Sequence, residues 1–305
     1  MRAVQISGYG GSEVLEIRDN VPPPIPQTGH VLVEVHAAGI NPFDIKVLSG
    51  AYQTMIPLKF PVTFGGDFAG VVTQTGEEVY GSAIVLSGGS GAFAQYACAA
   101  VGKIASKPKK LNFIEAAGLP VAGLTAIEAI KDRIDLQKNQ KILIHGGAGG
   151  VGNIAIQFAK SIGAYVATTV NADDADFVKG LGADEVINYK TQAFEEMLKD
   201  FDAVLDTVGG QVADKSYKVL KRSGVLVLLV SQVNEVLAKT YGVETIRQQS
   251  TIDTMHLTRL TQLVDNGNIK VHVDTVFSIN QVREAFSHLQ TGHPRGKVVL
   301  KIEEQ

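Results

Sequence analysis

The stretch Lys141–Lys160, KILIHGGAGGVGNIAIQFAK, decides the fold that this sequence predicts. It opens with a short apolar run, Ile142–Ile144, which favours a buried strand. A turn dense in glycine follows, and the apolar residues of the run Asn153–Lys160 then have helical spacing. The expected order is therefore strand, glycine turn and helix.

Three glycines in this turn, Gly147, Gly149 and Gly152, satisfy the pattern G-x-G-x-x-G. The pattern becomes specific between a strand and a helix, which is its context here. The first glycine permits a tight turn, the second lets the backbone approach a pyrophosphate, and the third lets the helix pack against the strand. Unpaired N–H groups at the helix N-terminus then face the anion. A glycine-rich surface loop without a ligand is the alternative, but the flanking elements favour a dinucleotide site.

Composition sets the class of protein. The chain has 305 residues, 45% hydrophobic and 19% charged, which is the balance of a globular protein with two domains or one large one. Its net charge of −3 gives no general attraction to nucleic acid, and no apolar run has the length of a transmembrane helix. The N-terminus lacks the apolar core of a signal peptide, and the single cysteine, Cys98, points to a reducing compartment. We therefore expect a cytoplasmic protein with no nucleic-acid or membrane partner.

Hydrophobic periodicity changes near Phe113. Before it, short β-type runs separated by glycine and proline turns predict a compact, mostly β domain. From there to about residue 250, strands and helices alternate, which predicts an α/β fold with a doubly wound parallel sheet. Ligands of such sheets bind at the carboxyl ends of the strands. The expected strands are Ile142–Ile144, Tyr165–Val170, Glu185–Asn188, Ala203–Asp206 and Val225–Leu229.

The last part of the chain differs again. The runs Met255–Val264 and Asn280–Leu289 favour helices, and Lys297–Ile302 favours a strand that could rejoin the N-terminal β region. We therefore expect a substrate domain at residues 1–118, completed by residues 268–305, and a dinucleotide-binding domain at residues 119–267.

Several further segments carry a family resemblance. They are Gly39–Pro42 with Asp44, Phe64–Gly70, Leu119–Pro120 with Gly123–Ala126, Asn139–Lys160, Asp206–Gly210, and Gly292–Lys297. Together they resemble the medium-chain dehydrogenase/reductase superfamily and, within it, the zinc-free quinone oxidoreductase (zeta-crystallin-like) branch. The resemblance spans nearly the whole chain. It implies a Rossmann doubly wound parallel sheet, a GroES-like mostly β domain, and a homodimer.

This superfamily has branches with and without a zinc site, and the residues of this chain argue against such a site. A zinc site needs three or four cysteine, histidine or carboxylate ligands. Asn41 to Asp44 stands where the zinc branch would supply its first cysteine, and Gly66-Asp67 replaces the Gly-His-Glu that supplies its histidine. Without a metal to polarise a carbonyl oxygen, the substrate must be electrophilic already, or hydrogen-bond donors must carry its developing charge. Quinones and α,β-unsaturated carbonyls meet this condition, so we expect hydride transfer to them from NADPH.

Four polar residues are candidates for catalysis: Asn41, Asp44, Lys46 and Tyr52. The resemblance places Asn41 and Asp44 near the nicotinamide, although both residue types also cap helices well. Lys46 or Tyr52 could donate a hydrogen bond to the substrate oxygen or a proton to the enolate, or could be an ordinary solvated side chain. Asp67 is expected to order the turn Gly65-Gly66. Proton delivery from water stays open.

The residues expected to bind the cofactor are those of the glycine turn and those at neighbouring strand ends. They are Thr125, Gly147, Gly149, Gly150, Val151, Gly152, Thr169, Asn171, Tyr189, Gly209 and Lys297. An acidic residue at the end of the second strand would favour NADH, because it would accept from the ribose 2′-OH and repel a 2′-phosphate. The strand ends without one, which favours NADPH, while Asp173 and Asp174 just beyond it weaken that preference.

Two other functions stay open. The chain could be a dinucleotide-binding redox sensor or structural protein with little catalysis, since a fold alone does not fix function. Tight cofactor binding without turnover would reveal it. An enoyl-thioester reductase would need a long acyl channel and a basic patch for the carrier, and neither can be recognised in the sequence.

Overall fold

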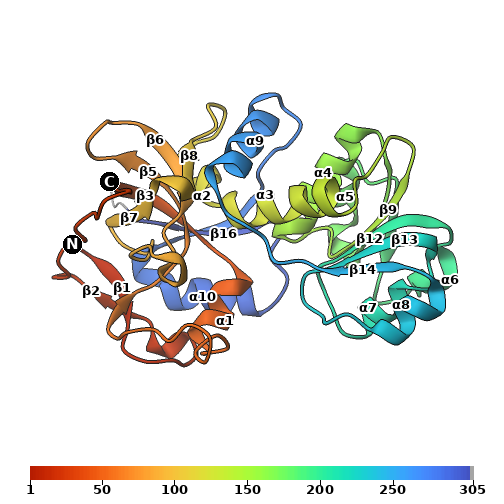
Figure 1. Ribbon diagram of the computed structural model, residues 1–305, viewed down its shortest axis with the longest axis horizontal. Coiled ribbons are helices and arrows are strands. Elements are labelled where there is room, and N and C mark those ends of the chain that lie inside the picture. Colours follow the sequence, from red (N-terminus) through yellow and green to blue (C-terminus); the bar gives the residue numbers. More distant parts are fainter. Residues whose placement is uncertain (303–305) are drawn as a thin grey trace. The chain divides into compact units, whose positions relative to one another are not determined.

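The computed structural model describes residues 1–302, and the chain divides into two compact units (Figure 1). The first unit contains Met1–Leu124, Ile252–Gly267 and the chain from Val271 onward. The second contains Thr125–Thr251 and Asn268–Lys270. Helix α9 (Thr254–Asp265) belongs to the first unit because it packs against β8 (Ile104–Ser106), whereas the bounds expected from the sequence placed these residues with the dinucleotide-binding domain.

The first unit is mostly β. Its larger sheet has seven strands in the order β15-β16-β3-β5-β6-β8, with β7 paired to β3, and a smaller sheet has the order β2-β1-β4. The strands are β1 (Ala3–Ile6), β2 (Glu16–Arg18), β3 (His30–Ile40), β4 (Val62–Thr63), β5 (Asp67–Val72), β6 (Glu78–Ser82), β7 (Tyr96–Ala100), β8, β15 (Val273–Ser278) and β16 (Lys297–Lys301).

Its helices are α1 (Pro42–Leu48), α2 (Phe113–Ala117), α9 and α10 (Val282–Gln290). Strand β16 lies antiparallel to β3, with Val298 opposite Ile40, so the last strand of the chain does rejoin the N-terminal β region. Large aromatic side chains fill the core, where the rings of Phe93 and Phe286 lie 6.2 Å apart.

The second unit is built on six parallel strands in the order β11-β10-β9-β12-β13-β14 (Figure 1). Chain order reverses between β9 and β12, which makes this a doubly wound sheet with its ligand crevice expected at that switch. The expected α/β fold with a Rossmann sheet is confirmed. The strands are β9 (Lys141–His145), β10 (Tyr165–Val170), β11 (Glu185–Asn188), β12 (Phe201–Asp206), β13 (Leu220–Leu228) and β14 (Glu244–Arg247).

Helices connect these strands. They are α3 (Pro120–Ile127), which begins in the first unit, a π-helical turn (Glu128–Arg133), α4 (Gly150–Ile162), α5 (Ala175–Gly180), α6 (Phe194–Met197), α7 (Gln211–Ser216) and α8 (Glu235–Tyr241). The sixth strand, β14, was not expected, because its sequence ETIR is short and half charged. Within residues 1–302, no helix combines the length and the apolar character needed to cross a membrane.

Candidate functional site: a glycine turn and a buried polar cluster

The glycine turn follows β9 in the second unit. A Cβ atom added to Gly147 would lie 2.1 Å from Thr168 Oγ1, and one added to Gly152 would lie 2.2 Å from the carbonyl oxygen of Gly146. Both positions are therefore closed to any larger residue. At Gly149 a Cβ would meet only the Gly146 oxygen, at 3.4 Å, so this part of the turn is open. The steric room at the three glycines is what their expected roles require, with close packing at Gly147 and Gly152 and open space at Gly149.

Gly149 is the N-cap of α4, a helix of 13 residues. The first N–H groups of a helix, here those of Gly150, Val151 and Gly152, have no intrahelical acceptor, and the helix dipole adds positive potential at this end. Asn153 closes the other side of the turn, because its Nδ2 donates to the Gly149 oxygen at 2.7 Å. A turn with room at its centre and free donors at its edge fits the pyrophosphate of a dinucleotide.

The neighbouring strand ends lie along the same edge. Thr169 is opposite His145 at the end of β9, and the Tyr189 N–H donates to the Val170 oxygen at 3.1 Å. Because parallel strands end at one edge of the sheet, Thr169, Asn171 and Tyr189 come together with the glycine turn. The side chain of Asn171 accepts from the N–H of Asp174 at 3.1 Å and so caps the short turn after β10.

Gly209 follows β12 at this edge, with a φ of +84° that favours glycine. The buried carboxylate of Asp206 accepts from the N–H groups of Val208 and Gly209, at 2.9 and 3.0 Å. Asp206 therefore holds the turn that carries Gly209.

A buried histidine supports the glycine turn. His145 is fully buried, and burial lowers its pKa to about 3, so the ring is neutral. The Ser216 hydroxyl donates to the Val212 oxygen at 2.7 Å, so at its contact with His145 Nε2, 3.0 Å long, Ser216 accepts. His145 Nδ1 then accepts from the Thr169 hydroxyl at 3.0 Å. The Thr169 hydroxyl donates its proton to His145, and the Thr169 carbonyl oxygen accepts from the Gly146 N–H at 3.2 Å. Thr169 therefore stabilises the glycine turn from its buried side.

The second group of candidate residues forms a buried polar cluster in the first unit: Asn41, Asp44, Asp67 and Lys297. Lys297 Nζ donates to Asn41 Oδ1 and, at 3.0 Å, to the oxygen of Ile40. Asn41 Nδ2 donates to Asp67 Oδ2 at 2.9 Å, and Asp44 Oδ2 accepts from the Asn41 N–H at 2.8 Å. Lys297, expected from the sequence to bind cofactor, is thus bonded to a candidate catalytic residue.

Burial dominates the electrostatics of this polar cluster. It raises the pKa of Asp44 to about 7 and that of Asp67 to about 6, while the Lys297 charge opposes both shifts. Burial also lowers the pKa of Lys297. Asp67 does not order the turn Gly65-Gly66 as expected: its Oδ2 accepts from Asn41 and from the Val121 N–H at 3.0 Å, and its Oδ1 has no hydrogen-bond partner in the part of the chain that the structure describes. The side chain turns inward because Asn41 and α3 supply donors there.

The other two catalytic candidates lie outside the polar cluster. Lys46 is exposed on α1, and Tyr52 is half-buried with its ring 5.2 Å from that of Phe43. For neither the Lys46 ammonium nor the Tyr52 hydroxyl do residues 1–302 supply a hydrogen-bond partner. Both remain available to a ligand.

Two buried residues of the second unit were not expected to matter. Glu128 and Gln248 are 5% and 6% exposed and lie 3.5 Å apart, Gln248 Nε2 to Glu128 Oε2, next to Thr125. Glu128 could have been recognised as the one charged residue inside the largely apolar run Val121–Ile130. Gln248 follows the strand that was missed, so nothing local marked it.

Comparison with known proteins identifies the family. Residues 27–109 match the family described as an alcohol dehydrogenase GroES-like domain, and residues 181–300 match that described as zinc-binding dehydrogenase. The chain is 35% identical over 318 residues to the NADPH-dependent alkenal/one oxidoreductase, chloroplastic, of Arabidopsis thaliana, covering 98% of this chain and 79% of that protein. It is 33% identical over 325 residues to the quinone-oxidoreductase QR1, chloroplastic, of Triphysaria versicolor, covering 99% and 98%.

A solved structure gives the same result. The quinone oxidoreductase from Coxiella burnetii matches with a TM-score of 0.89 and 32% identity over 99% of each chain. The zinc ion implied by one family description does not fit the donors present, since no three His, Cys, Asp or Glu side chains among the described residues are grouped to hold a metal ion. The chain belongs to the medium-chain dehydrogenase/reductase superfamily, in its zinc-free quinone oxidoreductase branch.

Proposed function

We propose that the protein is an NADPH-dependent oxidoreductase that transfers hydride to quinones or α,β-unsaturated carbonyls without zinc. The observation that carries this proposal is the glycine turn, open at Gly149 and placed before α4 at the switch of a doubly wound sheet. The names of the relatives support it, since one is an NADPH-dependent alkenal/one oxidoreductase and another a quinone oxidoreductase.

Residues of the second unit would hold the cofactor. The N–H groups of Gly150, Val151 and Gly152 would bind the pyrophosphate, and the strand ends at Asn171 and Tyr189 would bind the adenosine half. Thr125 and Gly209 would border the nicotinamide half. A reduced nicotinamide bound there would supply the hydride. The choice of NADPH over NADH rests on the end of β10, which lacks an acidic residue to repel a 2′-phosphate.

Residues of the first unit would act on the acceptor. Reduction leaves negative charge on the acceptor oxygen, which needs donors because residues 1–302 contain no group of side chains suited to hold a metal ion. Tyr52 and Lys46 carry donors without a partner in residues 1–302, so either could stabilise this charge or pass a proton to it. Asn41 and Asp44 would act on the position of α1, which carries Lys46, because the side chain of Asp44 accepts from the N–H of Asn41, the N-cap of that helix.

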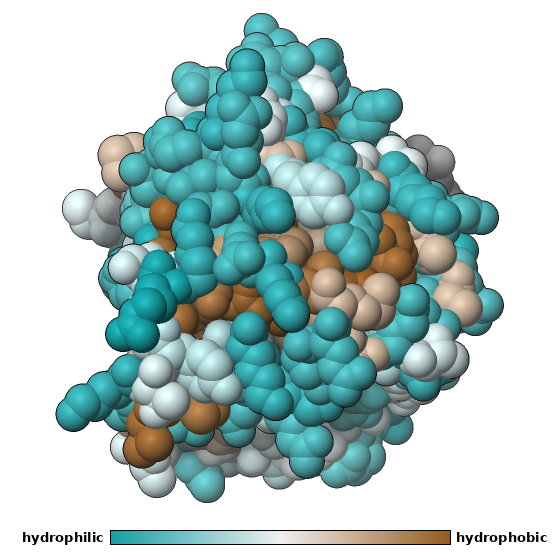
Figure 2. Space-filling model, turned by 90° about the vertical axis from the view of Figure 1, so that its right-hand side faces the viewer, coloured by the Kyte–Doolittle hydropathy of each residue, from teal (hydrophilic) through white to brown (hydrophobic). Residues whose placement is uncertain are grey.

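Assembly and location are further parts of the proposal. The face that Figure 2 shows is mainly hydrophilic, with a band of hydrophobic side chains across its middle, which supports a homodimer. Val236, 74% exposed on α8, is one large apolar side chain of the second unit that a partner would cover. Light scattering should give twice the chain mass. A cytoplasmic location is supported by the single cysteine and is tested by cell fractionation, although the relatives from Arabidopsis thaliana and Triphysaria versicolor are named as chloroplastic.

Loss of nicotinamide absorbance tests the activity. NADPH should be consumed when a naphthoquinone or an enone is added, and a chelator should not change the rate. Turnover of a simple alcohol that stops with chelator would contradict the proposal. Tight NADPH binding without turnover on any acceptor would instead favour the redox sensor. For the cofactor, a ligand at 100 times its Kd adds about 2.7 kcal/mol of stability, so a larger thermal shift with NADH than with NADPH would reverse the preference.

A further inference from the structure

Glu128 is a carboxylate buried in the second unit at an unusual place in the backbone. It begins the π-helical turn Glu128–Arg133, in which the Ile134 N–H reaches back five residues to the Ala129 oxygen at 2.9 Å. Such turns are rare and cluster at functional sites. A buried charge is costly unless hydrogen bonds satisfy it, so its partners indicate what this residue is for.

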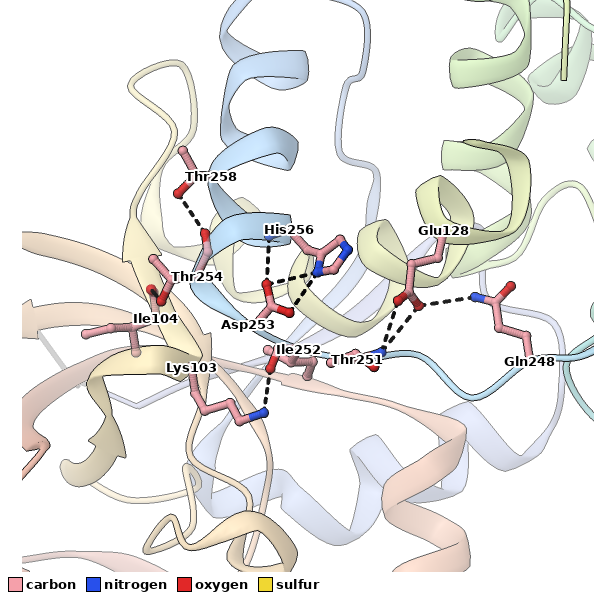
Figure 3. A network of polar contacts seen from close by, with 10 residues as sticks. All are labelled: Lys103, Ile104, Glu128, Gln248, Thr251, Ile252, Asp253, Thr254, His256 and Thr258. Atoms are coloured by element: carbon pink, nitrogen blue, oxygen red, sulfur yellow. Dashed lines mark hydrogen bonds and ion pairs between the residues drawn. The ribbon is translucent and has the colours of Figure 1, made fainter. Parts of the chain in front are cut away.

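Two of its partners come from a segment more than a hundred residues away, Gln248–Thr251. The Thr251 N–H points at both carboxylate oxygens, at 3.4 and 3.3 Å, and Gln248 Nε2 lies 3.5 Å from Oε2 (Figure 3). Gln248 Nε2 also donates to the oxygen of Thr125 at 3.0 Å, and the hydroxyls of Thr125 and Ser250 are 2.8 Å apart. Glu128 and the segment therefore form a closed polar ring around Thr125.

The segment lies where a dinucleotide site has its edge. It follows β14 directly, and the Gln248 N–H continues the ladder by donating to the Leu228 oxygen at 3.0 Å. It is therefore at the carboxyl ends of the parallel strands. Immediately beyond it, Lys103 Nζ donates to the Ile252 oxygen at 2.7 Å within the first unit, so the chain is held on that side too (Figure 3).

One atom of this ring argues against a purely space-filling role. Gln248 Oε1 is buried and has no hydrogen-bond partner in residues 1–302. An apolar side chain would avoid that unmet acceptor, so the amide is suited to fixing geometry rather than to filling the core.

We propose that Glu128 is a positioning residue for the nicotinamide end of the cofactor site: its buried carboxylate fixes Gln248–Thr251 and, through Gln248 and Ser250, sets the position of Thr125. The inference rests on the proposed function, since it requires that a nicotinamide dinucleotide binds at this sheet edge.

The substitution Glu128→Gln tests it, because an amide keeps the size but presents a donor to the donors of Thr251 and Gln248. Glu185→Gln is the matched control, since Glu185 lies in the same unit at the amino end of β11 and its side chain accepts from the Tyr165 hydroxyl at 2.8 Å, away from Thr125. Calorimetry measures the Kd of NADPH and of 2′-phospho-ADP-ribose, which lacks the nicotinamide. We expect Glu128→Gln to weaken NADPH about tenfold and the fragment less than about twofold.

A second readout needs no cofactor. The Thr251 amide should exchange with deuterium about tenfold faster in Glu128→Gln than in the control, because one of the two carboxylate oxygens that it faces is replaced by a donor and the negative charge is removed. Should that variant fail to fold, Ser250→Ala leaves Glu128 in place and removes the hydroxyl that contacts Thr125 and accepts from Gln248 Nε2 at 3.1 Å. NADPH should then bind about fivefold more weakly with the fragment unchanged.

The outcomes separate two failures. Equal losses of NADPH and fragment, or no loss of either, would overturn the positioning role while leaving the proposed function standing. Wild-type protein that binds the fragment and NADPH no better than an unrelated anion would overturn the proposed function and this inference with it.

Discussion

Replacing Lys297 by methionine should destabilise the first unit in a way that depends on pH. The ammonium is buried, and it is the cation that faces the carboxylates of Asp44 and Asp67 inside the polar cluster. Methionine keeps the length of the chain but removes the charge and both Nζ hydrogen bonds, to Ile40 and Asn41. Two buried acids then remain without a counter-charge.

The size of the effect follows from that charge balance. Removing one partner of a buried ion pair costs about 3–5 kcal/mol, which corresponds to a fall in Tm of about 6–20 °C for a unit of this size. This full cost applies near pH 8, where both carboxyls are ionised in the wild type.

The cost should shrink in acid. Burial raises the pKa of Asp67 to about 6 and that of Asp44 to about 7, from 3.8 in the unfolded chain. An acid with a raised folded pKa loses stability as pH rises from its unfolded pKa through its folded one. Removing Lys297 raises both pKa values further, because its charge lowers them now. At pH 5 both carboxyls are largely neutral, so the variant should lose about 1 kcal/mol or less.

Thermal and urea unfolding of wild type and Lys297→Met at pH 5 and pH 8 measure this difference. Lys301→Met is the control, since Lys301 is the exposed last residue of the same strand and should change stability by less than about 0.5 kcal/mol. A Lys297→Met cost below about 1 kcal/mol at pH 8, or an equal cost at both pH values, would refute the ion-pair account of this cluster.

Three further outcomes follow from the structure. Gly152→Ala should destabilise the protein by more than about 2 kcal/mol and abolish dinucleotide binding, because its Cβ would lie 2.2 Å from a backbone oxygen. Gly149→Ala should fold normally and only weaken binding. Unfolding and calorimetry compare both variants with Gly180→Ala, whose Cβ meets nothing within 4 Å. His145→Gln should flatten the rise of stability with pH between about pH 4 and 6, because a histidine with a folded pKa of about 3 is charged only in the unfolded chain over that window. Tyr52→Phe should lower kcat by about tenfold or more with less than about 1 kcal/mol change in stability if its hydroxyl serves the acceptor, and an unchanged kcat would leave Lys46 or water as donor.

Local patterns predicted most of the fold because its signals are local. The glycine turn, the alternation of strands and helices and the return of the last strand each depend on a few consecutive residues, and all three are confirmed. Strand β14 was missed because two of its four residues are charged, and only pairing with β13 makes it a strand. The place of α9 was decided by contacts with β8, which lies about 150 residues earlier.

The site was harder to predict because its bonds are not local. Asn41 shows the limit most clearly. Its sequence position predicted either a helix cap or a site residue, and the structure combines a cap with a polar bridge: Asn41 is the N-cap of α1 and its N–H donates to the Asp44 carboxylate, while its side-chain amide bridges Asp67 and Lys297. Lys297 is 256 residues away, so no spacing rule could pair them. A buried amide bound on one side by an acid and on the other by an ammonium cannot rotate without breaking both bonds, and this fixes the start of α1 more firmly than a cap alone would.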